Sequence, residues 1–135
     1  ARLSGPFLDR IDIRIDVPAV TALDMIEPGE AEPSESVAKR VSRARQIQAD
    51  RYFRLGATGV YNNAATSAKQ IEQVARPDEE SKKLLVQAAE KFNLSARAYH
   101  RVLKVARTLA DLGGAEHIKK PHIAEALGYR IGFGT

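Results

Sequence analysis

Two arginines, Arg97 and Arg101, stand one helical turn apart just after Ser95, a residue type that often caps helices. The spacing predicts that both side chains lie on one side of the first turns of a helix. A helix N-terminus attracts phosphate, because its amides are unpaired and its dipole end is positive, and it disfavours a cation without an anionic ligand. Arg97 is therefore a candidate phosphate ligand, with a solvated arginine as the alternative. Arg101 is the weaker candidate and is expected to pair with a carboxylate or face solvent.

A third arginine, Arg10, lies in the short charged segment that begins at Asp9 and ends at Asp12. A planar guanidinium can bond two oxygens of a transferring phosphoryl group, so it can stabilise the charge that develops on them. The spacing alone favours a simpler interpretation, in which Arg10 forms an ordinary salt bridge with Asp9 or Asp12.

The densest run of basic residues falls in one predicted helix and comprises Arg40, Arg43, Arg45, Arg51 and Arg54. Such a run could follow the phosphates of a nucleic acid. Few aromatic residues interleave with it, apart from Tyr52 and Phe53 at its end, so base stacking has little support. We therefore favour a solvated helix face.

Several other kinds of chemistry lack a motif in this sequence. The chain contains no cysteine, which excludes disulfides, thiol catalysis and thiolate zinc sites. His100, His117 and His122 do not have the spacing of metal ligands, so surface or capping roles are expected and no metal site is predicted. Neither a G-x-x-x-x-G-K-[ST] phosphate loop nor a nucleophile elbow occurs in the sequence. This sequence by itself is therefore not expected to hydrolyse a nucleotide.

Composition sets the class of protein. The 135 residues are 44% apolar and 28% charged, which suits one soluble domain with a modest core and an additional arm. The net charge of +4 permits contact with phosphates but does not require it. No segment approaches the roughly 18 apolar residues of a membrane span, and the start does not resemble a signal peptide, so we expect a cytoplasmic protein. The first residue is Ala1, not Met, which suggests a fragment of a longer protein.

The N-terminal third predicts an arm rather than part of a bundle. Apolar β-branched residues alternate with charged ones from Ile11 to Val17, which predicts a strand that ends at Pro18. A lone strand cannot pair its backbone groups, so its partners are expected elsewhere in a longer protein and the arm is expected to be loose. Residues 19–33 are predicted to be a linker.

The remainder predicts helices with short connections. The expected N-caps are Ser34, Ser67 with Gln70 completing a capping box, Asp78 and Ser95, and Pro121 is expected to open the last helix. The first of these helices should end near Phe53, and Asn93 is expected in a left-handed conformation between two helices. These two helices should pack as a hairpin or as a near-perpendicular corner. The fold class is therefore all-α, with an antiparallel bundle of four or five helices.

Three segments carry a resemblance to a known family. Residues 3–13, LSGPFLDRIDI, are similar to the end of the AAA+ core in magnesium-chelatase-like (ComM/YifB-type) ATPases, where the pattern reads S-G-P-[LF]-L-D-R-[IF]-D. Residues 94–112 resemble the lid helix of that family, L-S-x-R-x-x-x-R-[IV]-L-K-[VL]-A-R-T-[IL]-A-D-L. Residues 122–130 resemble the family ending, H-[LIV]-x-E-A-[LI]-x-Y-R. The match follows the right order along nearly the whole chain, although residues 19–92 contribute little to it.

The resemblance implies roles for the three arginines. Arg10 would be an arginine finger that reaches the γ-phosphate of ATP in a neighbouring subunit. Arg97 would be the sensor 2 arginine, which binds the γ-phosphate in its own subunit and couples closure of the lid to ATP, and Arg101 could supplement it. Residues 1–33 would then be the end of the AAA+ core, with the finger segment, strand and linker, and residues 34–135 the C-terminal helical lid domain.

The resemblance also implies cofactors and partners. The full-length protein would bind ATP with Mg²⁺ and assemble as a homo-oligomer, expected to be a hexamer, and this segment would contact the N-terminal AAA+ core of the same protein. The ComM branch is associated with DNA branch migration, and the chelatase branch with insertion of Mg²⁺ into a porphyrin; the Tyr129-Arg130 ending is closer to the first. Two alternatives remain. One is a free-standing nucleic-acid-binding module, with a helix-turn-helix around Asn93, and the other is a plain protein-interaction bundle.

Overall fold

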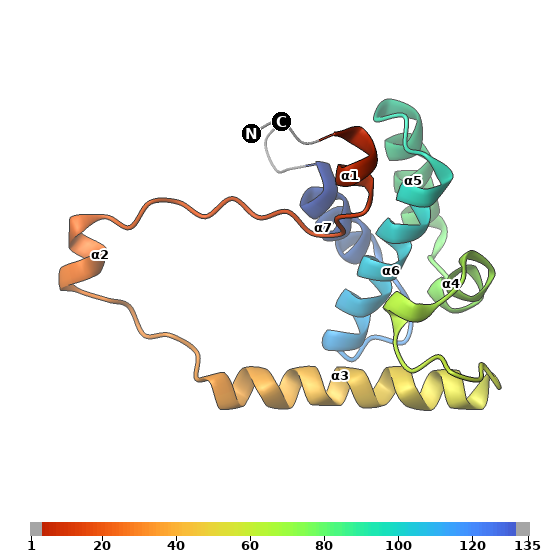
Figure 1. The fold of residues 1–135 in the computed structure, drawn as a ribbon, viewed down its shortest axis with the longest axis horizontal. Coiled ribbons are helices and arrows are strands. Elements are labelled where there is room, and N and C mark those ends of the chain that lie inside the picture. Colours follow the sequence, from red (N-terminus) through yellow and green to blue (C-terminus); the bar gives the residue numbers. More distant parts are fainter. Residues whose placement is uncertain (1–3, 132–135) are drawn as a thin grey trace.

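The computed structural model describes residues 4–131 and is all-α in this part of the chain. The N-terminal arm, residues 4–33, carries two one-turn helices, α1 (Gly5–Asp9) and α2 (Ala22–Ile26). A bundle follows, with one short 3₁₀ helix, η1 (Asn63–Ala65), and five α-helices: α3 (Ser34–Arg54), α4 (Ala68–Ala75), α5 (Glu79–Lys91), α6 (Ala96–Leu112) and α7 (Lys120–Ile131). The predicted all-α class is confirmed, and Figure 1 shows the arm as a long excursion beside the bundle.

The predicted strand between Ile11 and Val17 is wrong for this structure. The segment is extended, but no strand is assigned within residues 4–131, because no second strand offers its backbone as a partner. Its backbone is instead tied to the bundle by the amide of Arg14, which donates to the carbonyl of Tyr129 at 2.9 Å, and by the carbonyl of Ile11, which accepts from Arg130 at 3.2 Å. Ile15 and Val17 remain 69% and 86% exposed.

The first long helix, α3, begins at Ser34 as expected but is not capped by it. The N-cap residue is Pro33, which is extended and makes no side-chain capping bond. Only the C-terminal half of α3 packs on the bundle, through Ala44, Gln48 and Tyr52, while the N-terminal half projects away from it (Figure 1). Val37 and Val41, in the N-terminal half, are therefore exposed.

The other caps follow the sequence closely. Ser67 and Gln70 form the predicted capping box of α4, and the side chain of Asp78 accepts the amide of Ser81 at the start of α5. Asn93 has a φ of 49°, which confirms the left-handed residue expected between α5 and α6. Helix α7 begins at Lys120, one residue before Pro121.

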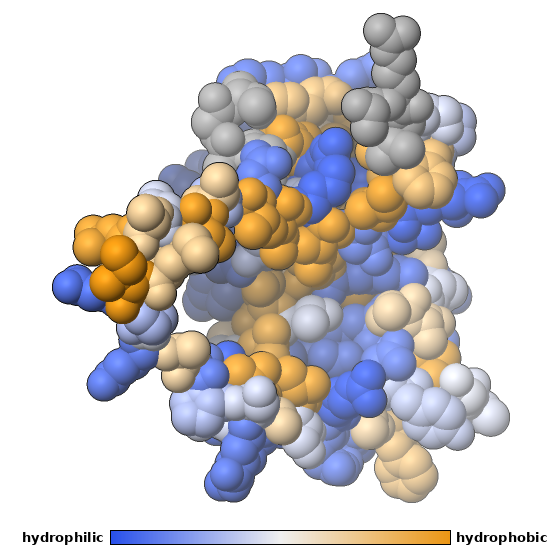
Figure 2. Space-filling view, turned by 60° about the vertical axis from the view of Figure 1, so that its left-hand side comes forward, coloured by the Kyte–Doolittle hydropathy of each residue, from blue (hydrophilic) through white to orange (hydrophobic). Residues whose placement is uncertain are grey.

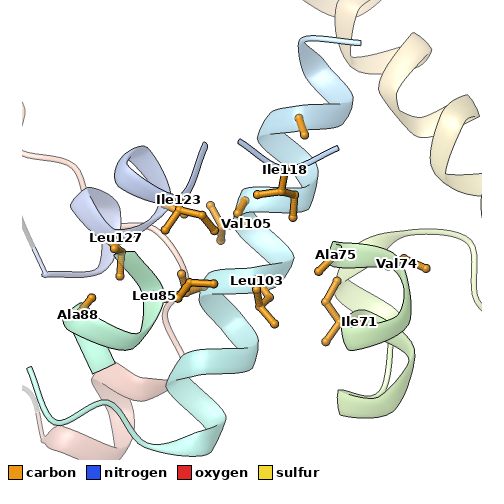
Figure 3. Packing of buried hydrophobic residues seen from close by; sticks show 14 of the residues in the cluster. Ile71, Val74, Ala75, Leu85, Ala88, Leu103, Val105, Ile118, Ile123 and Leu127 are labelled. Atoms are coloured by element: carbon orange, nitrogen blue, oxygen red, sulfur yellow. The ribbon is translucent and has the colours of Figure 1, made fainter. Parts of the chain in front are cut away.

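Helix α6 is the centre of the bundle. It packs against α7, α4, the C-terminal half of α3 and η1, whereas α5 packs mainly against α7. The hairpin considered for α5 and α6 is therefore not formed. Figure 3 shows the result, with Leu103 on α6 between Leu85 of α5 and Ile71 of α4. In this arrangement the exposed residues of α6 are Ala96 and Arg97, at its N-terminus.

Candidate functional site

The N-terminus of α6 presents Arg97 to solvent. The hydroxyl of Ser95 accepts the amide of Ala98 at 3.0 Å, which fixes the first turn of the helix. Ala98, the next residue, is buried, and Arg97 is exposed. Its guanidinium makes no hydrogen bond or ion pair with any residue that the structure describes. Arg97 is therefore available to an anion from outside the chain.

Arg97 shares a shallow pocket with three other basic side chains. The pocket has a volume of about 260 Å³ and is lined by Ala68, Arg97, His100, Arg101 and Lys104. Ala68 is the first residue of α4, so the positive end of a second helix also faces this space. Burial lowers the pKa of Lys104, and the positive charge of Arg101 lowers it further. The pocket is electropositive and suits a phosphate group.

Three of these basic groups already have partners within the chain, and two of them, Lys104 and His100, bind groups near α4. Nζ of Lys104 donates to the carbonyl of Ala64 at 3.1 Å. Nε2 of His100 lies 2.9 Å from a carboxylate oxygen of Glu72. Both contacts join α6 to the segment around α4, so they shape the wall of the pocket, and Arg97 is the arginine of this wall left without a partner among the described residues.

Arg10 ends helix α1 and is also unpaired. Its backbone amide caps the short helix, and its guanidinium has no partner within residues 4–131. The salt bridge that spacing favoured, from Arg10 to Asp9 or Asp12, is not formed. Those two carboxylates bind other arginines instead. An unpaired, exposed guanidinium at this position can reach an anion on another molecule.

Arg101 is the arginine that binds Asp12. Its Nη1 donates to Oδ1 of Asp12 at 2.8 Å and to the main-chain carbonyl of Arg10 at 3.1 Å. Of the alternatives open for Arg101, the structure therefore shows the pairing with a carboxylate. The structure thus brings the segment of Arg10 against α6, one turn from Arg97.

Arg130 is a functional candidate that the sequence analysis did not single out. It comes from α7 and is buried, with Nη2 donating to the carbonyl of Asp9 at 3.1 Å and to its carboxylate at 3.3 Å. Its Nη1 donates to the carbonyl of Ile11 at 3.2 Å. The only sequence signal was its place in the final Tyr129-Arg130 pair of the family pattern, and nothing local indicated that it would meet the arm.

Arg107 and Asp111, in the second half of the lid-helix pattern, are buried in the bundle. Arg107 and Asp111 are both 2% exposed and are joined through Nε and Oδ1 at 3.2 Å. Asp111 also accepts from Arg51 and from Asn63, at 3.0 Å for each contact. Burial lowers the pKa of Arg107, and the neighbouring carboxylate of Asp111 opposes this shift. These groups hold α3, η1 and α6 together.

The basic run on α3 is split by the fold. Arg51 belongs to the buried network, and Arg40 forms an exposed pair with Glu32. Arg43 and Arg45 are exposed and have no partner among the described residues. This distribution fits a solvated helix face better than a continuous track for nucleic acid. A helix-turn-helix is also poorly supported, because its reading helix would be α6, the most enclosed helix of the bundle.

The part of the chain that the structure describes offers neither a cluster of metal-binding side chains nor a membrane-spanning helix. Residues 4–131 contain no group of three or more histidine, aspartate or glutamate side chains placed to hold a metal ion. His122 caps α7, since its Nδ1 accepts the amide of Lys119 at 2.9 Å. None of the helices in this range combines the length and apolarity needed to cross a bilayer.

Comparisons with known proteins agree with the resemblance noted in the sequence. Residues 31–130 match the family model described as magnesium chelatase, subunit ChlI C-terminal. The chain is 43% identical over 130 residues to competence protein ComM of Haemophilus influenzae, an alignment that covers 96% of this chain and 24% of ComM. It is 36% identical over 132 residues to YifB of Escherichia coli, with 96% of this chain and 24% of YifB covered. The chain thus spans about a quarter of the length of these relatives, and it belongs to the magnesium chelatase subunit ChlI C-terminal family.

Proposed function

We propose that this chain is the lid and arginine-finger segment of a ring-shaped AAA+ ATPase. Arg97 binds the γ-phosphate of ATP in its own subunit, and Arg10 reaches the γ-phosphate in the neighbouring subunit. The observation that supports this proposal is that both guanidinium groups are exposed and free of partners within residues 4–131, while four arginines that join parts of the fold are held by carboxylates: Arg51, Arg101, Arg107 and Arg130. An arginine that serves only the fold would be expected among the paired ones.

The proposed mechanism uses charge and position. Negative charge builds up on the phosphoryl oxygens during transfer, and a guanidinium placed at those oxygens stabilises it. The pocket beside Arg97, with Lys104 and the start of α4, adds positive potential on the same side. When bound, ATP with Mg²⁺ would supply the reacting phosphate, and Arg97 would draw the lid towards it. Loss of the γ-phosphate would release the lid, a hinge-type movement.

The rest of the motor is also part of the proposal. The chain is expected to work with the N-terminal AAA+ core of the same protein in a homo-oligomer, with a hexamer as the expected form. DNA is the proposed substrate, as the resemblance to the ComM branch of the family implies. The sequence contains no phosphate-loop motif, so the segment alone is expected to be inactive in ATP hydrolysis. The cytoplasm is the expected compartment.

The test for Arg97 uses the full-length protein. Arg97→Ala is expected to lower ATP turnover about 10²- to 10³-fold, the usual cost of removing one donor from a developing oxyanion. Arg43→Ala is the matched control, because Arg43 is also exposed and without a partner among the described residues but lies on α3. Circular dichroism should show that both variants are folded. Turnover that is unchanged in Arg97→Ala would exclude the sensor role.

The test for Arg10 uses mixed rings. Arg10→Ala should lower turnover roughly 10³- to 10⁵-fold when every subunit carries it, as expected for an arginine finger. Mixed with subunits whose phosphate loop is disabled, the variant should recover part of its activity, because each subunit then supplies what its neighbour lacks. Absence of any recovery would show that Arg10 does not act across the interface. Stimulation of turnover by branched duplex DNA would test the substrate separately.

A further inference from the structure

Two arginines from the lid bind one short segment of the arm. Arg101 of α6 donates to the carbonyl of Arg10 at 3.1 Å and to the carboxylate of Asp12 at 2.8 Å. Arg130 of α7 donates to the carbonyls of Asp9 and Ile11 at 3.1 and 3.2 Å. We call this set of contacts the arginine clamp. It binds three consecutive carbonyls, those of residues 9, 10 and 11, and the carboxylates of Asp9 and Asp12.

The clamp fixes position rather than merely pairing charges. An ion pair between flexible surface side chains leaves the backbone free, but a guanidinium bonded to main-chain carbonyls holds the backbone itself. The Arg130 side chain is only 8% exposed, so water competes poorly for its contacts, and that of Arg101 is 25% exposed. Between these carbonyls lies Arg10, whose main chain is therefore held against the lid while its side chain stays free.

The clamp also links the two proposed phosphate ligands. Arg97 and Arg101 lie one turn apart on α6, and both line the same pocket. Helix α6 and helix α7, which carries Arg130, pack extensively on each other, so we expect them to move as one body. Any rotation of this body that brings Arg97 to a phosphate must also shift the backbone of Arg10.

We infer that Arg101 is a positioning residue that makes the placement of Arg10 depend on the orientation of the lid. This inference rests on the proposed function and deepens it. Closure of the lid on ATP through Arg97 would move Arg10 of the same subunit relative to the nucleotide of the neighbouring subunit. The occupancy of one site would in this way set the catalytic competence of the next, through contacts within a single chain.

The inference makes a distinctive prediction about the subunit in which Arg101 acts. A residue that positions the finger acts on the neighbouring site, whereas a second phosphate sensor acts on its own site. The experiment uses full-length rings in which wild-type subunits are mixed with an excess of subunits whose phosphate loop is disabled. Only residues that act across the interface can then change turnover when they are substituted in the disabled subunits.

Arg101→Gln in the disabled subunits is expected to slow the wild-type sites roughly 10- to 100-fold, the scale of a catalytic group misplaced by about 1 Å. The turnover number should fall and the KM for ATP should stay constant, because ATP binding in the wild-type subunit is untouched. Asp12→Asn should give a similar loss, and the two substitutions together should cost less than the product of their separate effects. Arg101→Lys, which keeps a donor for the carbonyl and the carboxylate, should restore part of the rate.

Two controls separate the possible failures. Arg10→Ala in the disabled subunits should slow the neighbours more strongly than Arg101→Gln, and Arg43→Ala there, an exposed arginine of α3, should have no effect. If Arg10→Ala slows the neighbours but Arg101→Gln does not, the positioning role is wrong and the proposed function stands. If Arg10→Ala is also silent, the finger itself is wrong and the inference fails with it. Ring assembly of each variant, measured by size-exclusion chromatography, ensures that a loss does not come from failed folding.

Discussion

The arm, residues 4–33, and the bundle, residues 34–131, use apolar side chains in opposite ways. The bundle encloses a core of aliphatic residues around α6, together with Tyr52. The arm has no buried residue, and Ile13, Ile15, Val17, Val20, Leu23, Met25 and Ile26 are all exposed. Figure 2 shows apolar atoms gathered over the arm.

The two regions are also held by different forces. Apolar burial and a dry ion network stabilise the bundle, and both are cooperative, because each group depends on its neighbours. The arm is attached mainly through the arginine clamp and the amide of Arg14. An apolar pattern therefore does not by itself place a segment inside a fold. A surface that can cover it must also be present.

The largest expected difference in stability is between substitutions of two aspartates that each bind arginine, Asp111 in the bundle and Asp12 in the arm. Asp111→Ala leaves Arg51 and Arg107 without their shared anion inside the bundle, and should lower the free energy of unfolding by about 3–5 kcal/mol. Asp12→Ala removes the partner of Arg101 at a partly exposed site and should cost at most about 1 kcal/mol. Urea denaturation measures both. Equal losses would contradict the distinction between the two regions.

Deletion of aliphatic groups should show the next largest contrast. Leu103→Ala opens a cavity between α4, α5 and α6 and should cost about 2–5 kcal/mol. Ile15→Ala removes an exposed side chain from the arm and should change the free energy of unfolding by no more than about 0.5 kcal/mol. A substantial loss from Ile15→Ala would mean that the arm is covered in solution.

Substitutions at helix N-termini should give a smaller difference in stability between α3, which follows the arm, and α6, at the centre of the bundle. Ser95→Ala removes the bond to the amide of Ala98 and should cost about 1 kcal/mol. Ser34→Ala should cost a few tenths of a kcal/mol at most, because Pro33 occupies the N-cap position of α3 and Ser34 provides no capping bond. Thermal denaturation of the two variants compares them directly, and a larger loss from Ser34→Ala would contradict the observed cap.

The smallest effect on global unfolding is expected from the clamp. Arg130→Gln should accelerate hydrogen exchange at the amide of Arg14 several-fold, since about 1 kcal/mol of local contacts is lost where the arm meets Tyr129. The amide of Ala106, in the middle of α6, should exchange as before. Arg43→Gln is the control, because it removes the same charge at a distance from the arm. A parallel acceleration at Ala106 would show that arm and bundle open together.

Local sequence patterns were enough for much of the bundle. A capping side chain acts on amides two or three residues away, so Ser67, Asp78 and Ser95 could be assigned without knowledge of the fold. The all-α class and the left-handed Asn93 follow from equally local rules. The strand in the arm could not be settled in this way, because a strand exists only through hydrogen bonds to a second segment, and the described chain offers none.

The sequence by itself determined where most helices begin and which arginines have the residue type and spacing for phosphate chemistry. Tertiary structure alone decided which of those arginines are free. Arg97 and Arg10 have no partner among the described residues, whereas Arg51, Arg101, Arg107 and Arg130 are held by groups 4 to 121 positions away in the chain. The physical reason is that the fate of a long charged side chain is set by the carboxylates and carbonyls that folding brings within about 3 Å, and sequence spacing does not record that distance.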